Sequence, residues 1–164
     1  MCKGCGPTLS PEIQQLARFG GLRCPSEVAL LKWDDIHWDT NRFTVTSPKT
    51  KRYGKPSRVV PLFSNLRPFL DEAFEIANEG DIWVIPMLDG NTRKNLGTRF
   101  KKIIRRTGVE ILPKPFQNRR ASCQTDLEQT LPTYVVCQWL GNTPGIANKH
   151  YLTVTEDHFQ MAAA

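Results

Sequence analysis

The sequence predicts an α+β domain that is mostly helical and contains one small antiparallel sheet. Several segments place apolar residues on one stripe at helical spacing, as Ile13, Leu16 and Ala17 do. Two short runs with β-branched residues, 42–47 and 57–62, flank a polar linker and are typical of a β-hairpin with a long turn. A length of 164 residues with 40% hydrophobic residues suffices for one domain with a sizeable core.

The same patterns place the remaining elements. Helix-start residues such as Ser64 and glycines at helix ends bound the other apolar stripes. The apolar run 82–85 predicts a short strand. In the second helix, Val28, Leu30 and Leu31 are expected on the buried side. In chain order, we expect helices over residues 10–19, 25–31, 65–78, 95–107, 118–129 and 131–140, and a last short helix capped by 155–157.

No segment has the pattern of a membrane span or a secretion signal. The sequence contains no apolar run that approaches the roughly 20 residues needed to cross a bilayer, so we expect no membrane partner. Residues 1–7 lack the apolar core of a signal peptide. We therefore expect a cytoplasmic protein, with residues 1–10 as a poorly ordered leader and residues 11–164 as a single domain.

The five cysteines favour reduced thiols over a disulfide framework, because their number is odd and their spacing irregular. Cys24, Cys123 and Cys137 are expected to pack as small apolar residues. Cys2 and Cys5 have the spacing of a zinc knuckle, but no second pair of cysteines or histidines completes four ligands. We expect no metal site.

The positive charge is concentrated in two segments. The chain has 22 Lys and Arg against 16 Asp and Glu, a net charge of +6. Residues 91–120 hold ten basic side chains and one acid, Glu110, and residues 44–58 hold five basic side chains and no acid. Elsewhere 7 basic residues face 15 acidic ones. Two basic runs on an acidic body indicate either two solvated faces or a site for a polyanion.

Four residues in and near these segments have the chemistry that a phosphodiester requires. Phosphoryl transfer spreads negative charge over the non-bridging oxygens, which guanidinium groups match with paired hydrogen bonds. Arg23 lies between two predicted helices, and Arg119 starts another, whose dipole adds positive charge. Lys49 lies in the hairpin turn, and Tyr151 carries a phenol that can act as a covalent nucleophile beside positive charge. Each of these residues taken alone is more often a surface or packing residue.

Four stretches of the sequence, in order, resemble the tyrosine recombinase (phage integrase) family. FGGLRCPSEVALLKWDDI is similar to the first box of that family, and TVTSPKTKRYGKPSRVVPL to its β2–β3 hairpin. PFQNRRASCQTDL is similar to the second box, H-x-L-R-x-x-x-A-T. WLGNTPGIANKHYLTV resembles the third box, in which the nucleophilic tyrosine follows nine residues after a histidine; Asn142 and Tyr151 have that separation here. The resemblance covers about residues 11–160.

The resemblance implies a catalytic domain of the tyrosine recombinase fold, acting in site-specific DNA recombination or integration. Arg23 and Arg119 would hold the scissile phosphate, and Lys49, with Lys51 as the alternative, would protonate the 5′ leaving oxygen. Tyr151 would attack phosphorus and form a 3′-phosphotyrosyl intermediate without a metal or nucleotide cofactor. The implied partner is double-stranded DNA, bound by a homo-oligomer in the nucleoid.

Two positions depart from the family pattern. Phe116 occupies the histidine position of the second box and can neither donate a hydrogen bond nor transfer a proton. Asn142, at the histidine position of the third box, can donate a hydrogen bond to a phosphate oxygen but cannot titrate near neutral pH. Loss of one donor to a transition-state oxygen typically costs about 10²–10³ in rate, so we expect impaired chemistry.

Two alternatives to an active recombinase stay open. The departures at Phe116 and Asn142 are also those of an inactive DNA-binding remnant of an integrase. Only about ten residues precede the first predicted helix, so the N-terminal helical domain that closes the family's clamp on DNA is expected to be absent. The other alternative is an RNA-binding or protein-interaction module with a basic surface.

Overall fold

A computed structural model describes residues 11–108, 110, 113–150 and 159–160. It is mostly helical with one three-stranded antiparallel sheet, so the predicted α+β class is confirmed. Its helices are α1 (Pro11–Arg18), α2 (Pro48–Lys51), α3 (Arg67–Glu75), α4 (Leu96–Thr107), α5 (Pro115–Glu128), α6 (Thr133–Leu140) and α7 (Pro144–His150). Its strands are β1 (Ile36–His37), β2 (Arg42–Thr46) and β3 (Ser57–Pro61), and its 3₁₀ turns are η1 (Val28–Leu30), η2 (Trp33–Asp35) and η3 (Pro86–Leu88).

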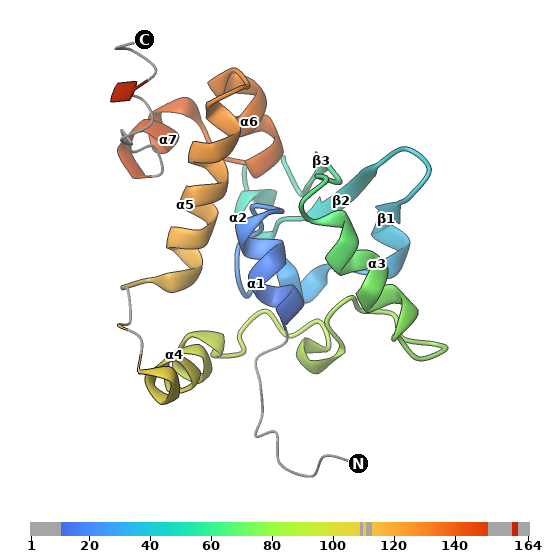
Figure 1. The fold of residues 1–164 in the computed structure, drawn as a ribbon. Coiled ribbons are helices and arrows are strands. Elements are labelled where there is room, and N and C mark those ends of the chain that lie inside the picture. Colours follow the sequence, from blue (N-terminus) through green and yellow to red (C-terminus); the bar gives the residue numbers. More distant parts are fainter. Residues whose placement is uncertain (1–10, 109, 111–112, 151–158, 161–164) are drawn as a thin grey trace.

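The helix α1 lies at the centre of the molecule (Figure 1) and packs on both α5 and α3. Its Ile13, Leu16 and Ala17 are fully buried, as the helical stripe predicts. One apolar core joins Ile13 and Leu16 to the sheet residues Phe43 and Val60. On the other side of α1, the helix α5 runs between the ends of α4 and α6.

The sheet has the order β1-β2-β3, and the predicted hairpin is confirmed. Phe43 faces Val60 in the register of β2 with β3. The polar linker between them contains the single helical turn α2, which the sequence pattern did not predict, and the short strand β1 was also not expected. The helix α6 packs against β3, which brings the hairpin to the C-terminal helices.

The prediction of a helix over residues 25–31 is wrong, because the structure has only the 3₁₀ turn η1 in this segment. Leu31 is extended, with ψ at 123°, and its carbonyl accepts the backbone N–H of Val84 at 3.1 Å. Trp33 donates its backbone N–H to Ile82 at 3.1 Å in the same pairing. This contact with a distant segment ends the helix early, and Val28 and Leu31 are buried while Leu30 is half-buried. The predicted strand 82–85 is reduced to one bridge, Lys32 with Trp83.

The boundaries of α3 and α5 also differ from those expected. The helix α3 spans Arg67–Glu75 rather than 65–78, and Leu66 rather than Ser64 occupies its N-cap. The helix α5 starts at Pro115, three residues earlier than expected, because the fixed φ of proline suits the first helical turn. The expected helix capped by 155–157 lies outside the described residues.

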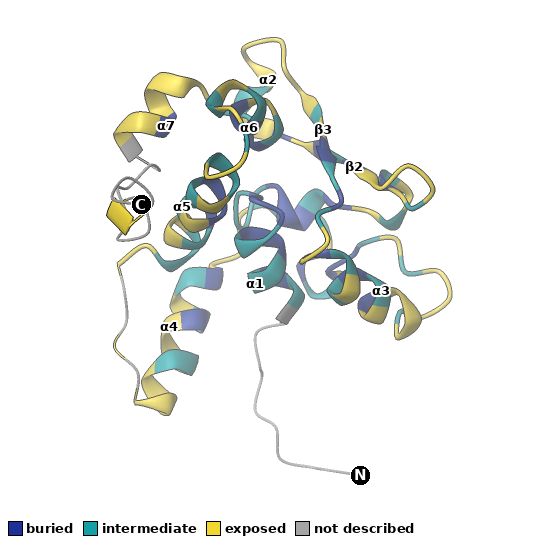
Figure 2. Cartoon of the chain, turned by 45° about the horizontal axis from the view of Figure 1, so that its top comes forward, coloured by how far each residue is buried: buried dark blue, intermediate teal, exposed yellow. Residues whose placement is uncertain are grey.

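The helix α4 confirms its prediction closely. The Asn95 side chain accepts the Thr98 backbone N–H at 3.1 Å and caps the N-terminus, and Gly108 ends the helix in the left-handed region. Leu96 and Phe100 are buried, and Arg99 is half-buried. The other basic residues of α4 are exposed: Lys101, Lys102, Arg105 and Arg106. Figure 2 shows this division along α4 and the mostly exposed surface of α7. In the described part of the chain, no helix is long and apolar enough to cross a membrane.

Candidate functional site

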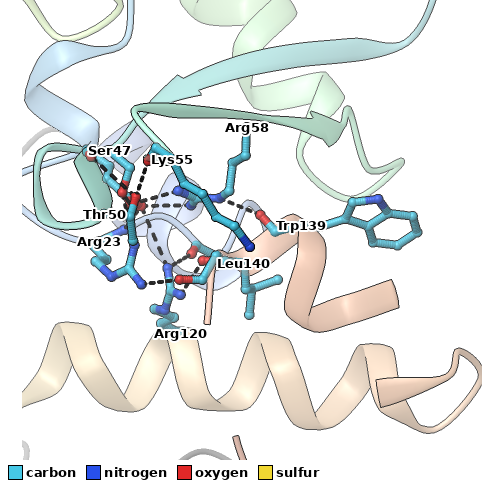
Figure 3. Close-up of polar contacts among 11 residues, drawn as sticks. Arg23, Ser47, Thr50, Lys55, Arg58, Arg120, Trp139 and Leu140 are labelled. Carbon is cyan, nitrogen blue, oxygen red and sulfur yellow. Dashed lines mark hydrogen bonds and ion pairs between the residues drawn. The ribbon is translucent and has the colours of Figure 1, made fainter. Parts of the chain in front are cut away.

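Three arginines from distant parts of the chain gather around one buried carboxylate, that of Glu27 (Figure 3). Arg23 donates to its Oε1 at 2.5 Å, and Arg58 donates to both oxygens at 2.8 Å. Nη1 of Arg120 lies 3.7 Å from its Oε2. Glu27 is 1% exposed. We call Arg23, Glu27, Arg58 and Arg120 the arginine cluster.

The same three arginines hold three consecutive carbonyl groups at the C-terminal end of α6. Arg58 Nε donates to the carbonyl oxygen of Trp139 at 2.5 Å, Arg120 Nη2 to that of Leu140, and Arg23 Nη2 to that of Gly141 at 2.6 Å. The last carbonyls of a helix have no partner within the helix. The cluster therefore supplies donors to them and fixes the loop that starts at Gly141 against β3 and the Arg23 segment.

The arginine cluster carries an excess of positive charge. Three guanidinium groups face one carboxylate, and the C-terminal end of α6 offsets only about half a charge. Burial by itself would raise the pKa of Glu27, but the hydrogen bonds of Arg58 and the charges of all three arginines outweigh it and lower that pKa from 4.5 to about 2. The carboxylate is thus ionised throughout the neutral range, and the surplus charge of its arginines fits an anion.

Arg23 is the member of the cluster that solvent reaches. Its side chain is 18% exposed, whereas those of Arg58 and Arg120 are 9% and 3% exposed. Its Nη1 also contacts the hydroxyl of Ser47 at 3.2 Å, and that hydroxyl donates to Glu27 at 2.7 Å. The predicted site residue Arg23 is therefore held in one orientation at an accessible edge of the cluster.

Arg119, the second predicted arginine, lies elsewhere. Its Nη2 donates to Gln14 on α1 at 2.8 Å, and its guanidinium lies 5.4 Å from the ring centroid of Phe100. Burial and the nearby charge of Arg18 lower the pKa of Arg119. Arg119 therefore does not join Arg23 in the arginine cluster, where Arg120 stands instead. Because α5 starts at Pro115, Arg119 also lies in the second turn and not at the helix start.

Lys49 and Lys51 both lie on α2 in the hairpin turn, and both side chains are exposed. Lys49 follows Ser47 by two residues, so the two Cα atoms lie within about 7 Å of each other. Ser47 is buried and bonded to Glu27, and its backbone N–H donates to Pro56 at 2.8 Å across the turn. Fewer residues therefore separate Lys49 than Lys51 from Ser47, which is bonded to the arginine cluster.

The amide of Asn142 is oriented by a chain of polar groups, of which Gln124 is buried and the others are half-buried. The Thr133 hydroxyl donates to Glu128 at 2.8 Å, and the Gln124 amide donates to the other oxygen of Glu128 at 2.7 Å. Gln124 thus presents its oxygen to Asn142, whose Nδ2 donates to it at 2.9 Å. Among the described residues, no donor reaches the buried Oδ1 of Asn142. Asn142 directly follows Gly141, whose carbonyl Arg23 holds.

Phe116 does not point to the cluster either. Its ring packs on Phe100, with centroids 5.2 Å apart, and is half-buried. The neighbouring Gln117 is exposed and stands three residues before Arg120. The family spacing H-x-L-R therefore aligns Gln117, not Phe116, with the histidine once Arg120 is the arginine that joins the cluster.

A cleft of about 370 Å³ borders the Arg23 segment. It lies between the N-terminal ends of α4 and α5, and its basic lining residues are Lys94, Lys101 and Lys114. None of the described residues that line it carries a carboxylate. The two helix N-termini add partial positive charge to that of the lysines.

The predicted nucleophile Tyr151 lies outside the described residues, as do Cys2 and Cys5. The helix α7, which ends at His150, was not expected from the sequence. Cys123 and Cys137 are buried and Cys24 half-buried, as predicted, and burial raises the pKa of the Cys24 thiol to about 12. Over the described ranges, no group of three or more His, Cys, Asp or Glu side chains could hold a metal ion.

Sequence comparison decides the family. The Phage integrase family matches residues 4–158, nearly the whole chain. The chain belongs to the phage integrase family. No curated protein matches it.

Solved structures share its fold at low sequence identity. The Tn1549 transposon integrase in complex with transposon right end DNA has a TM-score of 0.68 and 15% identity, over 93% of this chain and 57% of that chain. The XerA recombinase has a TM-score of 0.63 and 17% identity, over 92% of this chain and 55% of that one. The XerH site-specific recombinase, bound to a palindromic difH substrate in a post-cleavage complex, has a TM-score of 0.64 and 17% identity, over 93% and 44%. This phage integrase domain spans about half the length of these proteins.

The sequence patterns singled out some of the site and missed the rest. Arg23 was found from its box, but Glu27 and Arg58, which bind each other, were not. Both stand in the stretches that resemble the family, Glu27 in CPSE and Arg58 directly before VVPL. That position was the only feature of the sequence that could have identified them as site residues. Arg120 was not among the predicted site residues either, because the second box was aligned on Arg119.

Proposed function

We propose that this phage integrase domain cleaves and rejoins DNA through a 3′-phosphotyrosyl intermediate, and so carries out site-specific recombination or integration. The arginine cluster is the observation that carries the proposal. Its three guanidinium groups share one carboxylate, which leaves positive charge for the non-bridging oxygens of a phosphodiester. The family membership supports the scissile phosphate of DNA as that anion.

Arg23 contacts the phosphate directly, because it is the most accessible of the three arginines. One Nη2 proton of Arg23 is bonded to Gly141, and among the described residues the other has no acceptor. Arg120 supplies the second positive charge from its buried position. It is held there by its hydrogen bonds to the carbonyl groups of Gly21 and Leu140. Arg119 takes no part in the site, since it is bonded to Gln14.

The chemical step needs no cofactor. The Tyr151 oxygen attacks phosphorus and its phenol proton passes to water, the bond from phosphorus to the 5′ oxygen breaks, and Lys49 gives that oxygen its proton. Rejoining reverses the step, because a 5′ hydroxyl attacks the phosphotyrosine and releases the tyrosine. Asn142 donates to a phosphate oxygen where the family pattern has histidine.

The cleft beside Arg23 holds the DNA backbone next to the cleaved phosphate. Lys94, Lys101 and Lys114 line it, and they neutralise phosphates as point charges. We further propose that the partner is double-stranded DNA, bound by a homo-oligomer, and that the protein resides with DNA in the nucleoid. Among the solved structures with this fold, that of the Tn1549 integrase is a complex with transposon right end DNA, and that of XerH is bound to a palindromic difH substrate.

The second candidate function is a DNA-binding remnant with little or no chemistry. It is favoured by the absence of histidine at two places, since Gln117 and Asn142 stand where the family pattern has histidine. Neither amide titrates near neutral pH. An active enzyme with these residues should be slow by about 10²–10³ per missing donor.

The test is covalent trapping on a nicked duplex from which the cleaved fragment diffuses away. The active recombinase forms an adduct that survives SDS, and Tyr151→Phe forms none while its DNA affinity is unchanged. The remnant binds DNA without forming an adduct at any protein concentration or time. Failure of the wild type to bind DNA, or binding that is insensitive to salt, would contradict both functions.

A further inference from the structure

Arg58 connects parts of the site that the sequence separates. It lies on β3, its fork bonds both oxygens of Glu27, and its Nε bonds the carbonyl of Trp139 at the end of α6. Its side chain is 9% exposed, so solvent contributes little to its orientation. Arg58 thereby ties the hairpin that carries Lys49 to the loop that begins at Gly141.

The Arg58 side chain packs closely against the backbone of Gly141. A Cβ added at Gly141 would lie 3.1–3.2 Å from the Cδ, Nε and Nη1 atoms of Arg58. Gly141 also has a positive φ of 70°, which glycine adopts without strain. A side chain at position 141 would therefore crowd the Arg58 side chain.

Arg58 and Arg23 depend on the same oxygen. Oε1 of Glu27 accepts from Arg23 at 2.5 Å, from Arg58 at 2.8 Å and from Ser47 at 2.7 Å. Oε2 accepts from Arg58 and from the backbone N–H of Arg23, both at 2.8 Å. Without the Arg58 fork each oxygen loses one donor, and the plane of the carboxylate, to which the Arg23 guanidinium is bonded, is less firmly fixed.

We infer that Arg58 is a positioning residue for strand cleavage, which sets the orientation of Arg23 through Glu27 and the position of the α6–α7 loop through Trp139 and Gly141. This inference rests on the proposed cleavage function. Arg58 does not itself touch the phosphate, because Glu27 and the Trp139 carbonyl take three of its five N–H groups and its side chain is only 9% exposed. A lysine keeps the charge but lacks the planar fork, so it cannot hold both oxygens of Glu27 and the carbonyl together.

The experiment compares Arg58→Lys with the wild-type chain on the nicked duplex, and measures the single-turnover rate of adduct formation and the DNA affinity separately. Arg67→Lys is the matched control, because Arg67 is also ion-paired with a carboxylate, that of Asp71, but lies on α3. A misplacement of about 1 Å can cost about 10² in rate. We expect a rate loss of that size for Arg58→Lys with unchanged affinity, and no rate loss for the control.

A second variant separates positioning from folding. In Arg58→Ala, added guanidinium ion can fill the vacated seat between Glu27 and Trp139, and we expect millimolar guanidinium to restore part of the cleavage rate. A wild-type rate in Arg58→Lys would overturn the inference and leave the proposed function standing. A rate loss that only follows thermal unfolding, with affinity lost in parallel and no guanidinium rescue, would also overturn it. Wild-type protein that forms no adduct would overturn the proposed function, and the inference with it.

Discussion

Arg58 and Glu27 meet through two parallel hydrogen bonds of 2.8 Å, although 31 residues separate them in the chain. Such a paired contact fixes both the distance and the plane of the two groups. Because Arg23 and Arg120 lie around the same carboxylate, its position decides where their charges stand. The ionised state of Glu27 therefore determines the geometry of the whole arginine cluster.

The free energy of unfolding should depend on pH through the protonation of Glu27. Its pKa in the folded chain is about 2, below the ordinary value of 4.5. A lowered acid pKa stabilises the folded state fully above pH 4.5, and this stabilisation, on the order of 3 kcal/mol, is lost as the pH falls toward 2. Chemical unfolding at steps across this window should show a falling free energy of unfolding.

The control for that measurement is Glu27→Gln. It removes the titrating group and leaves three arginines without their carboxylate, so we expect a loss of about 3–5 kcal/mol at neutral pH. The remaining stability should fall less steeply between pH 4.5 and 2 than that of the wild type. Parallel curves for the two proteins would contradict the assignment.

Arg120 and Arg119 should differ sharply in their effect on cleavage. Arg120→Lys keeps a charge but cannot reach the carbonyls of Gly21 and Leu140 together, and we expect the cleavage rate to fall by about 10² or more. Arg119→Lys should stay within a few-fold of the wild type, because Arg119 contacts Gln14. Adduct formation at saturating DNA measures both, and the reverse order would restore Arg119 to the site.

Histidine should help at position 117 and harm at position 116. Gln117 is exposed and three residues before Arg120, so Gln117→His adds a donor at the family spacing without disturbing the core, and the cleavage rate should rise. Phe116→His removes a ring that packs on Phe100 and should lower the melting temperature without a gain in rate. A gain in rate from Phe116→His alone would favour the alignment that uses Arg119.

Lys49 should act on the leaving group. We expect Lys49→Ala to slow cleavage of ordinary DNA strongly, and Lys51→Ala to have a small effect, because Lys49 is nearer to Ser47 along the chain. A substrate with sulfur in place of the bridging 5′ oxygen needs no proton donor, since a thiol has a pKa of about 8.5 and leaves as the thiolate. This substrate should restore the rate of Lys49→Ala. No restoration would show that Lys49 does another task.

The sequence patterns predicted those elements of the fold that are determined by residues close together in the sequence. The hairpin and α4 follow from alternation and from a capped apolar stripe, which neighbouring residues determine. The segment 25–31 failed because Leu31 pairs with Val84, and no local pattern contains that contact. The helix α7 is a short polar segment with only Ala147 buried among its described side chains, so it gives almost no apolar period.

Local sequence patterns also could not predict which residues of the site come together. Successive residues on a helix point about 100° apart, so an error of one position in α5 exchanges an inward arginine for an outward one. The buried residues of α5 are Arg120, Cys123 and Gln124, two of them polar, and an apolar stripe does not reveal that face. Glu27 and its partners on β3 and α5 are brought together only by the tertiary fold, so their arrangement could not be predicted from spacing.

The most direct test of the central claim is a crystal structure of the Tyr151→Phe chain bound to duplex DNA that carries its intact cleavage site. We expect one phosphate within hydrogen-bonding distance of the Arg23 guanidinium, beside Arg120 and with the substituted ring at position 151 facing its phosphorus. A phosphate held by Arg119, or DNA bound across another surface with the arginine cluster empty, would contradict the claim.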